Sequence, residues 1–309
     1  MLETYVIHVT HRCNMKCLYC YESDKESTFT WEETKERIDK IIENSSSNKF
    51  HLEFLGGEPM LAWDLIKKIY EYIEIEYYEK VFVNYYGLTN NGTILTEEQL
   101  DYLSKNKRIT YAISLDGTKA ANQFRIMKKD NSNSYDIVVN NIKRLIEKDV
   151  SINVHLVVHP YNVSYLEESI FHLYNDLGVK SIGVGTIEST MYIDEDFMNE
   201  FIRQMDNVSK RMIDENLLDI LHIDILNYVK PKEDVRTYIY DKETGRIIAE
   251  SYGRIENKYE NDDSVIIRKC GFQEGTDGEL IYKMRLTSYK NHRRNIALKS
   301  KRPEGELWD

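Results

Sequence analysis

The chain has 309 residues and a net charge of -11, with 41% hydrophobic and 30% charged residues, which favours a globular protein over a disordered one. The acidic balance argues against nucleic-acid binding through the whole surface, and no apolar run approaches the ~20 residues of a membrane helix. Met1 to Thr10 show no basic-then-apolar signal segment, so we expect a cytoplasmic protein with no nucleic-acid or membrane partner.

Strands alternate with amphipathic helices over the first two thirds of the chain. The expected strands are Thr4–Thr10, Phe50–Leu55, Val81–Leu88, Ile109–Leu115, Ile152–His159 and Ser181–Ile187. The expected helices are Trp31–Asn44, Leu61–Tyr78, Thr96–Lys105, Tyr135–Lys148 and Tyr165–Leu177. These repeats predict an α/β fold in which a parallel sheet curls into a partial (β/α)6 TIM-like barrel over residues 1–193. Functional sites of such folds lie at the carboxyl ends of the strands.

A different pattern begins at residue 194. A helix is expected at about Asp194–Asn216, and strand-like pieces follow at Val235–Tyr240, Arg246–Ser251, Ser264–Lys269 and Glu279–Lys283. Turn signals such as Thr276-Asp277-Gly278 separate the strand-like pieces. We therefore expect residues 194–309 to form a small α+β appendage.

The last part of the chain is strongly basic. From Lys283 to Arg302 there are eight Lys or Arg residues and no acidic residue. Such a run is typical of a solvated tail or helix face. The alternative is a docking patch for an acidic peptide or an acidic electron donor.

Three of the four cysteines lie together on the loop after the first strand. The spacing of Cys13, Cys17 and Cys20 is C-x3-C-x2-C, whereas a disulfide scaffold would spread its cysteines along the chain. Three thiolates can each bind one iron of a [4Fe–4S] cluster, which leaves the fourth iron open to another ligand. The alternative is structural zinc with His11 as fourth ligand, but zinc sites usually pair cysteines as C-x2-C. The loop therefore favours an iron–sulfur cluster.

This loop, with Tyr19 just before the last cysteine and Asn14 just after the first, resembles the signature of the radical S-adenosylmethionine (SAM) superfamily. In that superfamily the open iron is chelated by the amine and carboxylate of SAM. After the second strand, Gly56-Gly57-Glu58-Pro59 resembles the GGEP motif that holds the SAM amino group. The glycines permit close approach of a ligand, and Glu58 can accept a hydrogen bond from an ammonium group. Taken alone, this motif is also compatible with an ordinary strand-to-helix turn.

Two further motifs follow in register. Asn91-Gly92-Thr93 resembles the T-N-G turn of the family, with Asn90 in place of Thr, and Ser114-Leu115-Asp116-Gly117 resembles its S-x-D-G segment. The resemblance implies that Ser114 binds the SAM ribose or carboxylate and that Arg125 binds the carboxylate. Where the family often has His-Asp, this chain has Asn122-Gln123.

The resemblance thus implies a set of residues that bind the cofactor, and one of them has an equally simple alternative. Ile182 aligns with an apolar residue that covers the adenine, but plain barrel core explains it as well. The expected set is Tyr19, Gly56, Gly57, Glu58, Asn91, Ser114, Asp116, Arg125 and Ile182.

The resemblance covers roughly residues 4–190 and is closest to the branch of sulfatase-maturing enzymes and peptide maturases. That branch normally adds a cysteine-rich C-terminal domain with auxiliary clusters. Here Cys270-Gly271-Phe272 resembles the opening of that domain, but Lys283 and Met284 stand where Pro and Cys would be. We therefore expect one cluster only. Cys270 is then a leftover buried thiol, a catalytic hydrogen-atom donor, a ligand of a cluster shared between chains, or a residue with a covalent role.

The implied activity is reductive cleavage of SAM at a [4Fe–4S] cluster, followed by hydrogen abstraction from a peptide or small protein. Epimerisation, crosslinking and side-chain oxidation are the reactions that such an oxidoreductase or maturase performs. A flavodoxin or ferredoxin is the expected electron donor, and no leader-peptide-binding domain is expected before the barrel. The alternatives are a radical SAM enzyme that acts on a small molecule and a non-catalytic relative that binds SAM or a peptide.

Overall fold

The computed structural model describes residues 3–20, 22, 26–45, 48–187, 193–227, 236–243, 247–252, 263–270 and 275–300. All six expected strands of the first two thirds are present, with bounds that differ by at most two residues. They are β1 (Glu3–Thr10), β2 (Lys49–Gly56), β3 (Phe82–Asn90), β4 (Ile109–Ser114), β5 (Ile152–Val158) and β6 (Ser181–Thr186).

The helices between these strands are also close to the prediction. They are α1 (Trp31–Asn44), α2 (Trp63–Glu76), α3 (Glu97–Lys105), α4 (Tyr135–Glu147) and α5 (Leu166–Asn175), with the short 3-10 helices η1 (Pro59–Ala62) and η2 (Val163–Tyr165). Thr96 accepts a hydrogen bond from the backbone N–H of Gln99, and the Gln99 side chain accepts one from Thr96 in return. This capping box marks the start of α3, as the sequence predicts. Gly178 follows α5 with a φ of +74°, a left-handed conformation that favours glycine.

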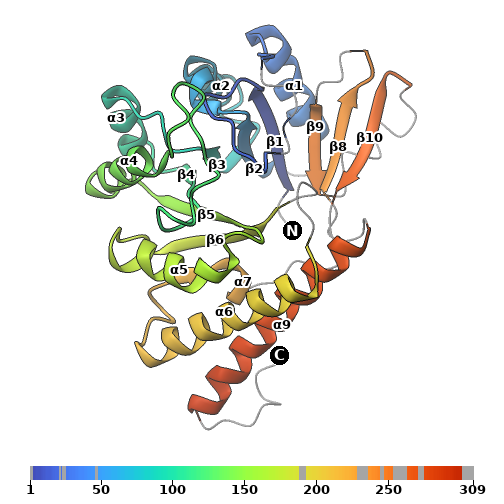
Figure 1. The fold of residues 1–309 in the computed structure, drawn as a ribbon. Helices are drawn as coiled ribbons and strands as arrows, with labels where there is room; N and C mark the ends of the chain where they lie inside the picture. Colours follow the sequence, from blue (N-terminus) through green and yellow to red (C-terminus); the bar gives the residue numbers. More distant parts are fainter. Residues whose placement is uncertain are drawn as a thin grey trace.

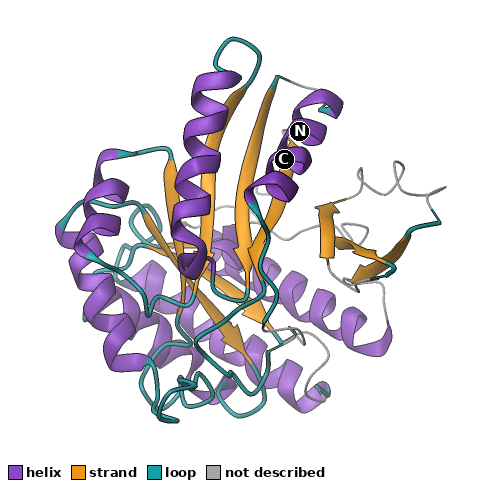
Figure 2. Cartoon of the chain, turned by 90° about the horizontal axis from the view of Figure 1, so that it is seen from above, coloured by secondary structure: helices purple, strands orange, loops and turns teal. Residues whose placement is uncertain are grey.

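The strands form one ten-stranded sheet in the order β10-β8-β9-β1-β2-β3-β4-β5-β6-β7 (Figure 1). Neighbouring strands from β1 to β7 (His222–Ile223) are all parallel, which confirms the expected α/β fold. β8 (Arg236–Asp241), β9 (Ile247–Tyr252) and β10 (Val265–Cys270) are antiparallel, and β9 pairs with β1. Seen from above, these three strands stand at one end of the curved sheet (Figure 2). The C-terminal strands therefore extend the sheet of the barrel.

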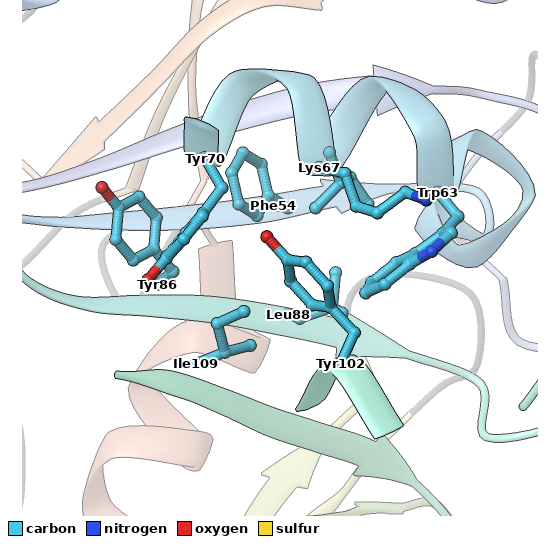
Figure 3. Close-up of a pocket in the computed structure, with 9 residues that line it drawn as sticks. Phe54, Trp63, Lys67, Tyr70, Tyr86, Leu88, Tyr102 and Ile109 are labelled. Carbon is cyan, nitrogen blue, oxygen red and sulfur yellow. The ribbon is translucent and has the colours of Figure 1, made fainter. Parts of the chain in front are cut away.

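The main hydrophobic core lies between the sheet and the helices that cover its outer face. Phe54 of β2 and Leu88 of β3 are each 1% exposed and point toward Trp63 and Tyr70 of α2 (Figure 3). Tyr86 is fully buried in the same layer, and its hydroxyl donates a hydrogen bond of 2.6 Å to Glu74. The small gap that these side chains line belongs to the core and shares no residue with the cysteine loop.

Two helices follow the last parallel β–α unit. The expected helix Asp194–Asn216 is α6 (Glu195–Asp214), whose N-cap Asp194 accepts a hydrogen bond from the Phe197 backbone N–H. The short α7 (Asp224–Asn227) comes after β7. None of the helices in the described part of the chain is both long and apolar enough to cross a membrane.

The prediction of a strand at Glu279–Lys283 and of a turn at Thr276-Asp277-Gly278 is wrong, because both lie in a helix, α9 (Gly275–Ser300). α9 packs against α6 (Figure 1) and buries Met284, Ser288 and His292, which are four residues apart. Ser209 of α6 is hydrogen-bonded to His292 at 2.8 Å. Since two of these three buried residues are polar, hydrophobic periodicity does not reveal the helix.

Candidate functional site

The cysteine loop runs from the end of β1 and is held against residues 124–128 by backbone hydrogen bonds. Lys16 N–H donates to Ile126 O at 2.8 Å, and Leu18 N–H donates to Phe124 O at 3.1 Å. On the other side of Met15, which is 1% exposed, Asn14 O accepts from Lys128 N–H at 2.9 Å. The loop is therefore fixed by main-chain contacts on either side of a buried anchor.

The three cysteines of the loop are half-buried, and none of them forms a disulfide. Burial raises the pKa of Cys13; the backbone N–H of Met15, which donates to Cys13 Sγ at 3.4 Å, opposes this, and the charges of Glu58, Cys17 and Cys20 add to it. All three thiols lie on one short loop, and the charges of Cys17 and Cys20 act on Cys13. Three neighbouring thiolates repel unless a cation compensates them, so the site fits a metal cluster.

The glycines after β2 let two turns of backbone come together. A Cβ atom on Gly56, whose φ is +147°, would lie 1.9 Å from the carbonyl oxygen of Thr10. A Cβ atom on Gly57 would lie 2.2 Å from the carbonyl oxygen of His11. The sequence predicts that a ligand approaches these glycines closely. In the structure, the backbone at the start of the cysteine loop approaches them instead. Both glycines thus set the position of the loop.

Glu58 is completely buried beside the loop, and its carboxylate accepts two backbone hydrogen bonds. Oε1 accepts from Met60 N–H at 2.9 Å, and Oε2 accepts from Asn91 N–H at 2.7 Å. Burial raises the pKa of Glu58 to about 7, although these hydrogen bonds and the charge of Arg125 lower it. The structure thus brings Glu58 and Asn91, from the ends of β2 and β3, into contact.

Asn91 also reaches the cluster loop. Its side-chain Nδ2 donates to Asn14 Oδ1 at 2.8 Å and to Cys13 Sγ at 3.9 Å. Asn14 in turn donates to the hydroxyl of Thr93 at 2.8 Å. This network ties the first cysteine to the turn after β3.

Tyr19, Asp116 and Arg125 form a buried network on the other side of the loop. The Tyr19 hydroxyl donates to Asp116 Oδ2 at 2.5 Å and accepts from the Arg125 guanidinium at 2.8 Å. Burial raises the pKa of Asp116, and the charge of Arg125 and the Tyr19 hydroxyl oppose that effect. Arg125 Nε is buried without a hydrogen-bond partner in the described structure, so this guanidinium keeps one donor for a further acceptor.

The hydrogen-bond networks described above do not include three of the expected site residues. Ser114 ends β4 half-buried, in register with His155 of β5. Ile182 is fully buried in the hydrophobic core, and its contact with the adenine stays a prediction. Cys270 ends the backbone of β10, and its side chain lies outside the described residues.

Sequence reasoning missed His159 and the structural use of Asn122. His159 is buried, stacks on Phe124 at 4.9 Å and lies 5.5 Å from the Tyr19 ring, and burial lowers its pKa to about 4. Asn122 Oδ1 accepts from the Asp116 backbone N–H at 3.1 Å. Asn122 departs from the family pattern, and this departure was the available signal that its environment is specific.

Comparison with known proteins gives the family. The family model described as the radical SAM superfamily matches residues 7–173. An uncharacterised protein of Methanocaldococcus jannaschii is 30% identical over 178 residues, which are 57% of this chain and 60% of that protein. A cysteine-type anaerobic sulfatase-maturating enzyme of Clostridium novyi is 25% identical over 164 residues, which are 50% of this chain and 43% of that enzyme.

A solved structure described as native anSMEcpe with bound AdoMet and Cp18Cys peptide has a similar fold, with a TM-score of 0.65 and 18% sequence identity. The likeness covers 73% of this chain and 64% of that chain, and at this identity it concerns the fold alone. It confirms the expected partial barrel. The chain spans less than two thirds of the length of each of these three proteins.

Proposed function

Because the chain belongs to the radical SAM superfamily, we propose that Cys13, Cys17 and Cys20 hold a [4Fe–4S] cluster and that the enzyme modifies a peptide or protein. The observation that carries this proposal is the group of three half-buried cysteines, outside any disulfide, at the carboxyl end of a parallel sheet. When bound, the cluster and SAM supply reductive bond cleavage and hydrogen abstraction, which no side chain provides.

The residues around the loop have distinct parts in this proposal. Glu58 binds the SAM amino group, since each carboxylate oxygen keeps acceptor capacity beyond one backbone hydrogen bond. Arg125 binds the SAM carboxylate through the donor that its network leaves unused. The half-buried hydroxyl of Ser114 binds the ribose or the carboxylate. Asn91 donates to Cys13 and so holds the first iron ligand.

The Tyr19–Asp116–Arg125 network has a positioning part. Tyr19 belongs to the cysteine loop and Asp116 follows β4, so their hydrogen bond joins the loop to the sheet. Asp116 Oδ1 also accepts from the Val157 backbone N–H at 3.2 Å, which adds β5 to the connection. We infer that this network keeps Arg125 directed at the SAM carboxylate.

The peptide class of the substrate is the finer part of the proposal. It is supported by the similarity to a sulfatase-maturating enzyme and by the fold shared with a structure that holds a peptide. We also propose a cytoplasmic location, because a reducing compartment keeps cysteine thiols reduced. The proposed electron donor is a flavodoxin or ferredoxin. Cys270 stays a predicted hydrogen-atom donor, which deuterium incorporation into the product would test.

The experiment is anaerobic reconstitution with iron and sulfide, followed by SAM and dithionite, with chromatography of 5′-deoxyadenosine. We expect 5′-deoxyadenosine from the wild type and none from the Cys17→Ala variant. A full cluster without this product would contradict the enzyme assignment. Mass spectrometry of short peptides encoded beside the gene then tests the substrate class, and modification of a small molecule alone would replace the peptide with that alternative.

A further inference from the structure

The inner face of the sheet, which points away from the helices, carries polar residues. Successive strand residues point to opposite faces. On β2, Phe54 points to the helix side (Figure 3), and Leu52, two residues before it, belongs to the same hydrophobic core. His51 and Glu53 therefore point to the inner face. Both of these side chains are half-buried. Barrel interiors of related folds are normally filled by layers of branched apolar residues, so this interior is not a simple packed core.

Glycines on neighbouring strands leave room for the inner polar side chains. Glu53 is in register with Gly87 of β3, where a Cβ atom would lie 2.9 Å from Glu53 Cγ. A Cβ atom on Gly183 or Gly185 of β6 would lie 2.8 or 2.6 Å from a ring nitrogen of His155. Glycine weakens a strand interior and is typical of places of close approach. The sheet thus keeps space where Glu53 and His155 lie.

Glu53 belongs to a group with His51 and Tyr85 that has polar atoms to spare. The Tyr85 hydroxyl donates to Glu53 Oε1 at 3.0 Å, and the His51 ring lies 4.1 Å from the Tyr85 ring. Glu53 Oε2 makes no hydrogen bond with the described residues, and His51 Nδ1 is buried without a partner among them. Buried polar atoms are normally hydrogen-bonded, so Glu53 Oε2 and His51 Nδ1, two residues apart on one face of β2, can each accept from a ligand.

The charge of the inner face selects the ligand. The described strands β2 to β6 carry two charged residues on this face: Lys49, which is exposed at the start of β2, and Glu53, which is half-buried. An ammonium or guanidinium group has donors for both Glu53 Oε2 and a neutral His51, since a neutral imidazole accepts at one nitrogen. An anionic group would meet the Glu53 carboxylate, while the Lys49 cation of the same strand is exposed at its start, and an apolar group would leave both acceptors unpaired.

We propose that Glu53, His51 and Tyr85 form a subsite that binds a Lys or Arg side chain of the peptide substrate. This inference rests on the proposed function and names the substrate feature that the barrel recognises. Glu53 lies three residues before Gly56, about 10 Å along the strand from the turn that leads to Glu58. The cation is therefore held deep in the barrel while a neighbouring part of the peptide lies at the cofactor end.

The test uses small probes that mimic side chains: n-butylammonium and n-propylguanidinium as cations, butyramide as neutral and butyrate as anion. Ligand-observed NMR measures their binding to the full chain without a cluster and with cluster and SAM. We expect the cations to bind more tightly than butyramide and butyrate. Glu53→Gln should weaken cation binding by about tenfold, because a charged hydrogen bond is lost. The matched control Glu76→Gln, at the exposed end of α2, should leave binding unchanged.

Two further variants keep the charge of Glu53 and test its geometry. Gly87→Ala should weaken cation binding by displacing the carboxylate, and Tyr85→Phe should weaken it less, since one neutral hydrogen bond is lost. Equal binding of cations and butyramide, or equal cation binding by wild type and Glu53→Gln, would overturn the subsite. The probes need neither cluster nor reductant, so this result and SAM cleavage can fail independently of each other.

Discussion

The two faces of the central sheet differ in kind. On the helix side, Phe50, Leu52 and Phe54 of β2 are each 1% exposed and pack into one apolar layer. On the inner side, the alternate residues His51 and Glu53 are half-buried and polar. Successive side chains of a strand point to opposite faces of the sheet. One set of β2 side chains therefore stabilises the fold, and the alternate set is available for chemistry.

The same division explains where the cofactor residues lie. Ser114 ends β4, and Asn91 and the cysteine loop follow β3 and β1, so these residues lie at the carboxyl ends of their strands. Ile182, whose cofactor contact is a prediction, lies within the apolar core. We expect substitutions in the two sets to separate stability from activity.

The largest effect is expected at the cysteine loop. Cys17→Ala removes one of three thiolate ligands, so the protein should fail to retain a [4Fe–4S] cluster and lose all SAM cleavage. Iron and sulfide content measures the loss, and circular dichroism checks that the cluster-free fold is retained. Cys270→Ala is the control and should retain the cluster. A full cluster in Cys17→Ala would show that the loop is not the ligand set.

On the helix face, Phe54→Ala should destabilise the fold by about 3–5 kcal/mol, because it enlarges the gap in a buried apolar layer. Its neighbour on the inner face, Glu53→Gln, should change stability by less than about 1 kcal/mol. Urea unfolding of both variants measures the difference. Similar losses for the two would contradict the division between the faces.

Away from the sheet, the α6–α9 interface should depend on pH. Burial, with the charge of Arg293, lowers the pKa of His292 to about 4 from its ordinary value of 6.5. The folded state therefore binds this proton less well than the unfolded state, and stability should fall as pH drops from about 6.5 to about 4. The expected loss is at most about 3 kcal/mol.

The difference between wild type and His292→Gln in urea unfolding, measured across that pH range, isolates this contribution. Burial also lowers the pKa of His159 to about 4. Because His159 is present in the wild type and in His292→Gln, its contribution cancels in the difference. An unchanged pH dependence in His292→Gln would show that His292 does not control the stability of the interface.

The smallest effect concerns the cluster potential. Asn91 Nδ2 donates to Cys13 Sγ, and such a hydrogen bond stabilises the more negative, reduced cluster. Asn91→Ala should lower the potential by a few tens of millivolts, since a hydrogen bond is worth about 1 kcal/mol. An anaerobic redox titration followed by electron paramagnetic resonance measures it. A higher potential in Asn91→Ala would contradict this role.

Sequence patterns predicted the barrel well because its strands and helices have clear periods of two and 3.6 residues. They failed at α9, whose buried Ser288 and His292 are polar and hide the helical stripe. The loop residues were found because their types and spacing follow from cluster chemistry. The alternation of His51 and Glu53 was also visible, but the sequence alone does not say which face of a sheet the helices cover.

The most direct test of the account is metal analysis and electron paramagnetic resonance of the reconstituted full chain, before and after SAM is added. We predict about four irons per chain and a reduced-cluster signal that changes shape with SAM, because one iron keeps an open position. A colourless protein that carries zinc at Cys13, Cys17 and Cys20, or a cluster signal indifferent to SAM, would contradict it.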